Sequence, residues 1–214
     1  MKTVAFYSYR CRNDKAKIAV NCAKHLSEMG KKVFVLCCDL FSPSLRYFAS
    51  QKFSLSDKPS KGFLDYLLIY QAIGQSPEFL KNYVTQTTDS GVHFMLESEI
   101  SSGYTSKILA VDWRYFFPEK QPILGVYFLL NLRNRIKDDF NPDIILIDMP
   151  AGITYIGTAI LAVWAKKIIF LTTNERCDQN GFNIISRYVN GDHAKVIVNN
   201  QNQVFQALNM LISD

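Results

Sequence analysis

The chain has 214 residues, of which 48% are hydrophobic and 20% are charged, a composition typical of a folded domain rather than a disordered segment. Its 24 basic and 19 acidic residues give a net charge of +5, which permits contact with an acidic surface but falls short of a nucleic-acid-binding signature. No apolar run reaches the ~18 residues that a membrane span needs, and the first residues lack the apolar core of a signal peptide.

The predicted elements begin with a strand–helix–strand unit. Residues 2–8 form a short apolar strand, and Asp14 is suited to cap a helix over 15–29, where apolar residues recur at helical spacing. Gly30 then supplies a left-handed stop for that helix. The following VFVLCC, residues 33–38, is apolar at every position, which is typical of a parallel strand covered on both faces.

The same alternation returns in the last third of the chain. The elements predicted there are strand 143–148, helix 156–165, strand 167–173, helix 179–189, strand 194–199 and helix 203–212. The middle is less regular, with helices predicted in GFLDYLLIYQAI, SSGYTSKILAVDWRYFF and LGVYFLLNLRNRIKDDF, and a strand in VHFMLES. Strands alternating with helices predict an α/β fold with a doubly wound, mostly parallel sheet. We expect a single domain over 1–214 with a largely helical insertion at about 42–141.

The cysteines indicate a reduced, cytoplasmic protein. They are odd in number and form no C-x-x-C motif: Cys11, Cys22, Cys37, Cys38 and Cys177. A metal site built from Cys11, Cys37 and Cys38 lacks the ligand spacing that zinc sites show. We therefore expect these thiols to be small buried hydrophobic groups.

Four segments, in this order, carry a resemblance to a known family: FYSYRCRNDKA, GKKVFVLCCDLFSPSL, NPDIILIDMPAGIT and LTTNERCDQNG. The chain resembles the ParA/MinD-like P-loop ATPases, in particular the bacterial subgroup whose phosphate loop reads Lys-Gly-Gly-Val-Gly-Arg/Lys-Thr. The resemblance covers essentially the whole chain. It implies the P-loop NTPase fold, ATP and Mg²⁺ as the family's ligands, and dimerisation across the bound nucleotide.

The resemblance also indicates that the phosphate loop is degenerate. Arg10 falls at the signature lysine, Lys15 at the phosphate lysine and Ala16 at the Mg²⁺-binding Ser/Thr, while Cys11, Arg12 and Asp14 replace the three glycines. A phosphate loop needs glycine because its backbone N–H groups must converge closely on the phosphate oxygens. A carboxylate at Asp14 would compete for those N–H groups and repel a phosphate.

At other positions the sequence matches the motifs of this family more closely. Asp148 falls at the Walker B aspartate, which orients hydrated Mg²⁺, and Asp39 falls at the second aspartate of the family's DLD motif. Asn174, Glu175 and Asn199 lie at predicted strand ends where the family contacts the nucleotide. Each of these residues can equally cap a turn for conformational reasons alone, so both interpretations stay open.

Three functions follow from these residues. The first is a degenerate protein that has lost ATP hydrolysis, needs no cofactor, and acts as a binding or regulatory subunit with a protein partner, as a homodimer or a heterodimer with an active relative. The second is an ATP-binding protein or weak ATPase with Lys15, Asp39 and Asp148 at work, where Asp148 holds Mg²⁺ through water. Its candidate nucleotide contacts are Arg10, Arg12, Lys15, Asn174, Glu175 and Asn199. The third is a nucleic-acid-binding module that uses the basic run Arg10–Lys17, which is otherwise a solvated basic turn.

Overall fold

The computed structural model describes residues 1–10, 14–56, 61–88, 90–118, 123–165, 167–173, 175–188, 194–198, 203, 204, 206 and 208. Its strands are β1 (Lys2–Tyr7), β2 (Val33–Cys37), β3 (Thr85–Gln86), β4 (His93–Met95), β5 (Ile144–Asp148), β6 (Lys167–Leu171) and β7 (Ala194–Val198). Its α-helices are α1 (Asp14–Glu28), α2 (Leu45–Lys52), α3 (Phe63–Ile73), α4 (Tyr104–Leu109), α5 (Trp113–Phe116), α6 (Ile123–Phe140), α7 (Tyr155–Val163) and α8 (Arg176–Tyr188). A short 3₁₀ helix, η1, spans Leu80–Tyr83.

The described strands form one seven-stranded sheet in the order β3-β4-β2-β5-β1-β6-β7. Every neighbouring pair is parallel except β3 and β4, which are antiparallel. This confirms the predicted doubly wound, mostly parallel sheet. Because β5 lies between β2 and β1, the carboxyl ends of these three strands meet at one edge of the sheet.

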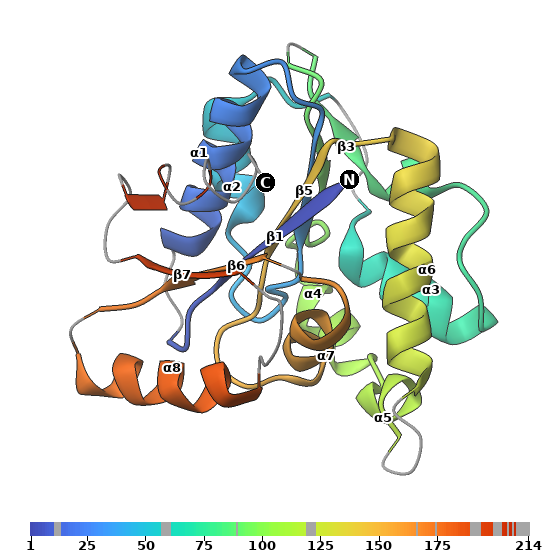
Figure 1. Ribbon diagram of the computed structural model, residues 1–214. Helices are drawn as coiled ribbons and strands as arrows, with labels where there is room; N and C mark the ends of the chain where they lie inside the picture. Colours follow the sequence, from blue (N-terminus) through green and yellow to red (C-terminus); the bar gives the residue numbers. More distant parts are fainter. Residues whose placement is uncertain are drawn as a thin grey trace.

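Helices cover both faces of the sheet (Figure 1), and the alternating strand residues divide the core into two layers. Ala5 and Tyr7 of β1 face the layer beneath α3, α6, α7 and α8. Val4 and Phe6 face the other layer, beneath α1 and α2. The central strands are buried along their whole length except at the first residue of β1, which explains why their sequences are apolar at almost every position.

The end of α1 is as predicted. Gly30 has a φ of 75°, in the left-handed region, and the N–H of Lys31 donates to the carbonyl of Leu26 over 3.0 Å. This is the hydrogen-bond pattern of a Schellman motif, which satisfies carbonyls that the helix end would otherwise leave free.

Several predicted boundaries are wrong. The single helix expected over SSGYTSKILAVDWRYFF is broken into α4 and α5, because Asp112 caps a new helix by accepting a hydrogen bond from Arg114 N–H at 2.9 Å. The segment between about 42 and 141 also contributes α2 and β3, which were not predicted, whereas the strand expected in VHFMLES is present as β4. Helix α8 begins at Arg176 rather than Gln179. Ile73 is the last residue of α3 and is 51% exposed, because the helix ends there at a left-handed Gly74.

Among the described helices, none combines the length and apolarity that crossing a membrane requires.

Candidate functional site

Lys15 lies in the first turn of α1 and is turned into the protein. Lys15 is only 1% exposed, and it is among the largest fully buried side chains of the described residues. Its Nζ lies 2.8 Å from Oδ2 of Asp39 and 3.2 Å from Oδ1 of Asp148. The residue at the phosphate-lysine position is therefore bound to two carboxylates of its own chain.

The two carboxylates are held at this point by neighbouring strand ends. Asp148 is the last residue of β5, and its carbonyl accepts a hydrogen bond from Cys38 N–H at 2.8 Å, which joins it to the end of β2. Asp39 follows β2 by two residues, and its Oδ1 accepts the N–H of Ser42 at 3.2 Å. Asp39 thus closes a turn with one oxygen and binds Lys15 with the other.

The pKa shifts show how the charges balance. Burial alone would lower the pKa of Lys15, but the nearby carboxylates of Asp148 and Asp39 outweigh it and raise that pKa above its usual value. Burial raises the pKa of Asp148 to about 6, because Lys15 offsets only part of the desolvation and Asp39 adds like-charge repulsion. One ammonium group therefore serves two carboxylates, and the buried cluster carries a surplus of negative charge.

The fit of this site to Mg²⁺ is poor as it stands. Carboxylate oxygens suit Mg²⁺, but those of Asp39 and Asp148 that face the site already hold Lys15, and Ala16 offers no hydroxyl. Among the described residues, no group of three or more His, Cys, Asp or Glu side chains is arranged to hold a metal ion. The cation in this arrangement is the lysine ammonium.

Arg10, at the signature-lysine position, is also engaged within the chain. Its Nη1 forms an ion pair with the carboxylate of Glu175, just before α8. Beside it, the ring of Tyr9 packs on Gly181 of α8, where an added Cβ would approach the ring to 2.0 Å. Two candidate nucleotide contacts, Arg10 and Glu175, are therefore brought together and bind each other.

Sequence reasoning missed a further carboxylate at this edge. Glu97 follows β4, is 0% exposed, and its Oε2 has no hydrogen-bond partner among the described residues. Burial raises its pKa, and the charge of Arg46 opposes that rise. A glutamate directly after the apolar run VHFML is a signal that could have found it, because a charged residue at the end of a buried strand is rarely accidental.

Several predicted positions lie outside the described residues. These are Cys11, Arg12, Asn13, Asn174 and Asn199, together with the side chain of Asp14. Cys37 and Cys38, in contrast, are described, and both are buried free thiols. Burial raises their pKa well above the usual range, in agreement with the expected role of small core side chains.

Exposed apolar side chains gather at the same end of the sheet. Phe41, Ile153 and Tyr155 are 59%, 60% and 61% exposed, and they line a cavity of about 270 Å³ together with Trp113. Phe117 stacks on Tyr155 with a centroid separation of 5.9 Å and nearly parallel rings. We call Phe41, Trp113, Ile153 and Tyr155 the apolar patch.

Comparison with known proteins supports the fold. No protein-family model matches the chain, and no curated protein does. Solved structures do match. MinD, the septum site-determining protein of Pyrococcus horikoshii, complexed with Mg-ADP, is 18% identical with a TM-score of 0.62, over 91% of this chain and 67% of that one.

Two further structures show the same likeness. McdA of Cyanothece in its apo form is 17% identical with a TM-score of 0.62, covering 99% of this chain and 81% of that one. The Aquifex aeolicus MinC:MinD cell division complex contains a chain that is 14% identical with a TM-score of 0.63, covering 96% of this chain and 72% of that one. These likenesses confirm the predicted P-loop NTPase fold of ParA/MinD-like proteins.

Proposed function

We propose that this chain is a ParA/MinD-like protein that has lost productive ATP hydrolysis and acts as a binding subunit for another protein. One observation carries the proposal: the buried Lys15 ammonium is shared between Asp39 and Asp148. The lysine that would meet a phosphate instead balances the two carboxylates that would serve the metal.

Freeing Lys15 for a phosphate would be unfavourable. The side chain would have to leave both carboxylates, and removing one partner from a buried ion pair typically costs about 3–5 kcal/mol. A metal ion would then have to take its place without the Ser/Thr hydroxyl that P-loops supply, because residue 16 is alanine. The loss of every loop glycine removes the backbone cradle as well.

A second candidate, weak ATP binding, is favoured by the same cluster. Lys15, Asp39 and Asp148 still converge at the start of α1, and similar structures were solved with Mg-ADP and with ATP. If Mg²⁺ bound the two carboxylates and a phosphate bound Lys15, these three residues would exchange each other for the ligand. No new site would have to form. ATP with Mg²⁺ is therefore the ligand to test.

The melting temperature of the protein with and without millimolar Mg-ATP separates the two candidates. A ligand present at a hundred times its Kd stabilises the folded state by ~2.7 kcal/mol, which corresponds to very roughly 5–10 °C for a chain of this size. We expect no shift with ATP or GTP. A shift of several degrees that Lys15→Met removes and Lys17→Met keeps would overturn the proposal, because Lys17 is exposed on the same helix.

The nucleic-acid alternative draws little support from the described part of the basic run. Lys15 is buried and Arg10 is paired with Glu175, which leaves Lys17 as the exposed cation without such a partner among the described residues of that run. We expect no salt-dependent retention on DNA. Retention that falls with salt and is lost in a variant with Arg10→Glu and Arg12→Glu would favour the alternative.

The partner, on this proposal, docks on the apolar patch. Exposed apolar surface of this kind is typical of interaction sites, and one similar structure is a MinC:MinD complex. We place the protein in a bacterial cytoplasm, where it would pair with a second copy or with an active relative.

Light scattering with Tyr155→Ser, compared with the exposed control Tyr47→Ser, tests the homodimer. Tyr155→Ser should weaken self-association and Tyr47→Ser should not.

A further inference from the structure

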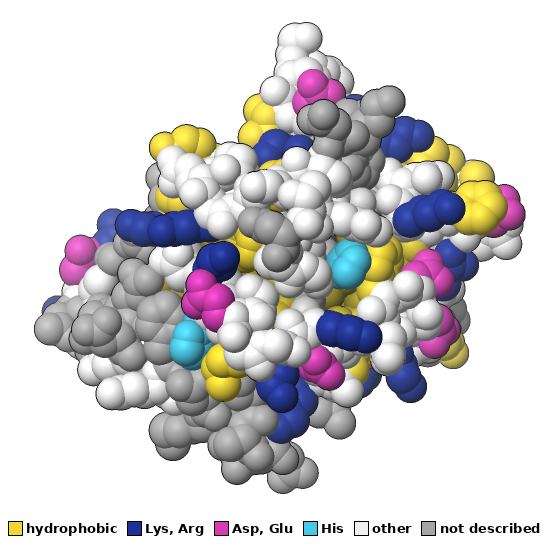
Figure 2. All heavy atoms as spheres, turned by 90° about the horizontal axis from the view of Figure 1, so that it is seen from above, with side chains coloured by type: hydrophobic (Ala, Val, Ile, Leu, Met, Phe, Trp, Pro, Cys, Tyr) yellow, Lys and Arg dark blue, Asp and Glu magenta, His cyan; other side chains and the backbone are white. Residues whose placement is uncertain are grey.

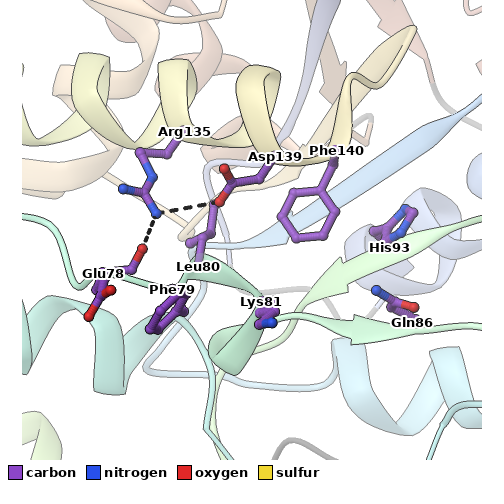
Figure 3. Close-up of a pocket in the computed structure, with 9 residues that line it drawn as sticks. All are labelled: Glu78, Phe79, Leu80, Lys81, Gln86, His93, Arg135, Asp139 and Phe140. Carbon is purple, nitrogen blue, oxygen red and sulfur yellow. Dashed lines mark hydrogen bonds and ion pairs between the residues drawn. The ribbon is translucent and has the colours of Figure 1, made fainter.

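A groove lies at the amino-terminal end of the sheet, the opposite end from Lys15 and the apolar patch. It runs between the last turns of α6 and the residues from Glu78 to Lys81 that lead into η1, with Gln86 of β3 and His93 of β4 at its side (Figure 3). Its volume is about 590 Å³. Figure 2 views this end of the molecule, and hydrophobic side chains are visible there between basic and acidic ones.

One rim of the groove presents its charges in a fixed order. In Figure 3, Glu78, Phe79, Lys81 and Gln86 follow one another along this rim. Neither Glu78 nor Lys81 forms an ion pair with a described residue. Between these two free charges the ring of Phe79 is 49% exposed, and the ammonium of Lys81 lies 5.5 Å from its centroid.

The opposite wall has no free charge of its own. Arg135 donates from Nη2 to the carbonyl of Glu78 at 2.6 Å and to the carboxylate of Asp139 at 3.4 Å (Figure 3). The rings of Phe140 and His93 lie beside each other with centroids 4.9 Å apart. Burial lowers the pKa of His93, which favours the neutral form of this ring. The wall is therefore aromatic and electrically balanced.

We propose that this groove binds an extended segment of a partner protein that carries a basic, an apolar and an acidic residue in that order along the groove. The basic residue meets Glu78, the apolar residue packs between Phe79 and Phe140, and the acidic residue meets Lys81. A neutral aromatic centre with opposite charges at its two sides selects a chain of mixed charge. It disfavours a nucleic acid or an anionic lipid surface, because Glu78 would repel either one and Arg135 is already paired with Asp139.

This site is separate from the proposed loss of ATP hydrolysis. The groove is formed by α6, η1, β3 and β4, and none of its lining residues contacts Lys15 or its two carboxylates. Its volume falls within the ~300–1,000 Å³ of ordinary ligand pockets. A segment bound here would leave the carboxyl ends of the strands open, so this protein could hold two partners at once.

The test uses the whole chain and four labelled synthetic peptides, followed by fluorescence anisotropy. The reference peptide is acetyl-Lys-Gly-Leu-Gly-Glu-amide, and the others replace Glu by Lys, Lys by Glu, or Leu by Gly. We expect the reference peptide to bind most tightly. Each like-charged peptide should bind roughly two- to five-fold more weakly, the range expected when one exposed ion pair is lost. The peptide without leucine should show no measurable binding.

Charge reversal at the rim gives the decisive comparison. Glu78→Lys should shift the preference from the reference peptide to the peptide with two glutamates, and Phe79→Ser should abolish binding of all four. Glu99→Lys, another exposed glutamate, is the matched control and should leave the order unchanged. A reference peptide that binds no better than its like-charged versions, or a preference that Glu78→Lys does not alter, would overturn the proposal. All three variants change exposed side chains, and their melting temperatures report whether each is folded.

Discussion

At the scale of single residues, Lys15 departs most from what the resemblance implies. In an active phosphate loop this lysine faces the ligand, whereas here its ammonium is buried between Asp39 and Asp148. A buried ion cluster of this kind is costly to break, because each member that remains keeps its charge without a partner. Lys15 should therefore matter for folding as well as for any ligand.

Replacing Lys15 tests this directly. We expect Lys15→Met to lower the free energy of unfolding by about 3–5 kcal/mol, because two buried carboxylates lose the ammonium that they share. Lys17→Met, two residues along the same helix and exposed, should change it by less than about 0.5 kcal/mol. Urea unfolding of both variants provides the measurement, and equal effects would show that Lys15 does not stabilise the fold through this cluster.

Asp148 gives a second prediction, in the pH dependence of stability. Its pKa is about 6 in the folded protein against an ordinary value of 3.8, so between about pH 4 and 6 the folded state binds more protons than the unfolded state. The free energy of unfolding should therefore fall as pH rises through this window, by ~1–3 kcal/mol from this group, and then level off.

Variants separate Asp148 from other titrating groups. Asp148→Asn keeps the shape of the side chain and should make the fall between pH 4 and 6 shallower than in the unmodified protein. Asp138→Asn, on the exposed side of α6, should leave the slope unchanged. The comparison is necessary because Glu97 also has a raised pKa, so its titration also lowers the free energy of unfolding as the pH rises. Identical slopes for the two variants would contradict the assignment.

At the scale of elements, the start of α3 is fixed against the end of β4. The N–H groups of Phe63 and Leu64 donate to the carbonyls of Leu96 and Glu97 at 2.7 and 2.9 Å. Gly62 lies in this contact, and an added Cβ would stand 2.2 Å from the carbonyl oxygen of Leu96. The helix can approach the strand end this closely only because residue 62 has no side chain.

Gly62→Ala should therefore destabilise the protein by about 1–3 kcal/mol, since a backbone carbonyl cannot move aside as a side chain can. Gly103→Ala is the matched change at a glycine where the nearest atom would be 3.9 Å away, and it should alter stability by less than about 0.5 kcal/mol. Thermal or urea unfolding measures both. A similar loss in the two variants would mean that the close approach at Gly62 relaxes easily.

The elements also show what the sequence could and could not predict. The apolar run of β2 and the stop at Gly30 follow from local chemistry, and both are confirmed. The contacts of Lys15 could not be predicted, because its partners lie 24 and 133 residues away and meet only where strand ends converge. The break between α4 and α5 was missed because helical spacing across it outweighed the capping signal of Asp112. Long-range packing decided the first outcome, and a local helix cap decided the second.

At the scale of the whole molecule, the fold holds an internal cation, the ammonium of Lys15, between two carboxylates at strand ends. If the ammonium of Lys15 replaces a metal ion, global stability should not depend on divalent cations in the unmodified protein. Chelation by EDTA, or addition of 10 mM Mg²⁺, should leave its melting temperature unchanged. Removing the ammonium should instead uncover two carboxylates that a divalent cation can neutralise.

The Lys15→Ala variant makes that exchange measurable. Mg²⁺ bound only in the folded state stabilises by RT ln(1 + [Mg²⁺]/Kd), which is about 1.4 kcal/mol at 10 mM if the Kd is ~1 mM. We expect 10 mM Mg²⁺ to recover this part of the loss in Lys15→Ala, and the recovery to disappear when Asp148→Asn is added. Equal responses of the variant and the unmodified protein would show that the lysine does not stand in for a metal. If Mg²⁺ stabilises only Lys15→Ala, then replacing this one lysine is enough to turn the buried carboxylates into a site that a divalent cation can neutralise, as in a metal-binding P-loop.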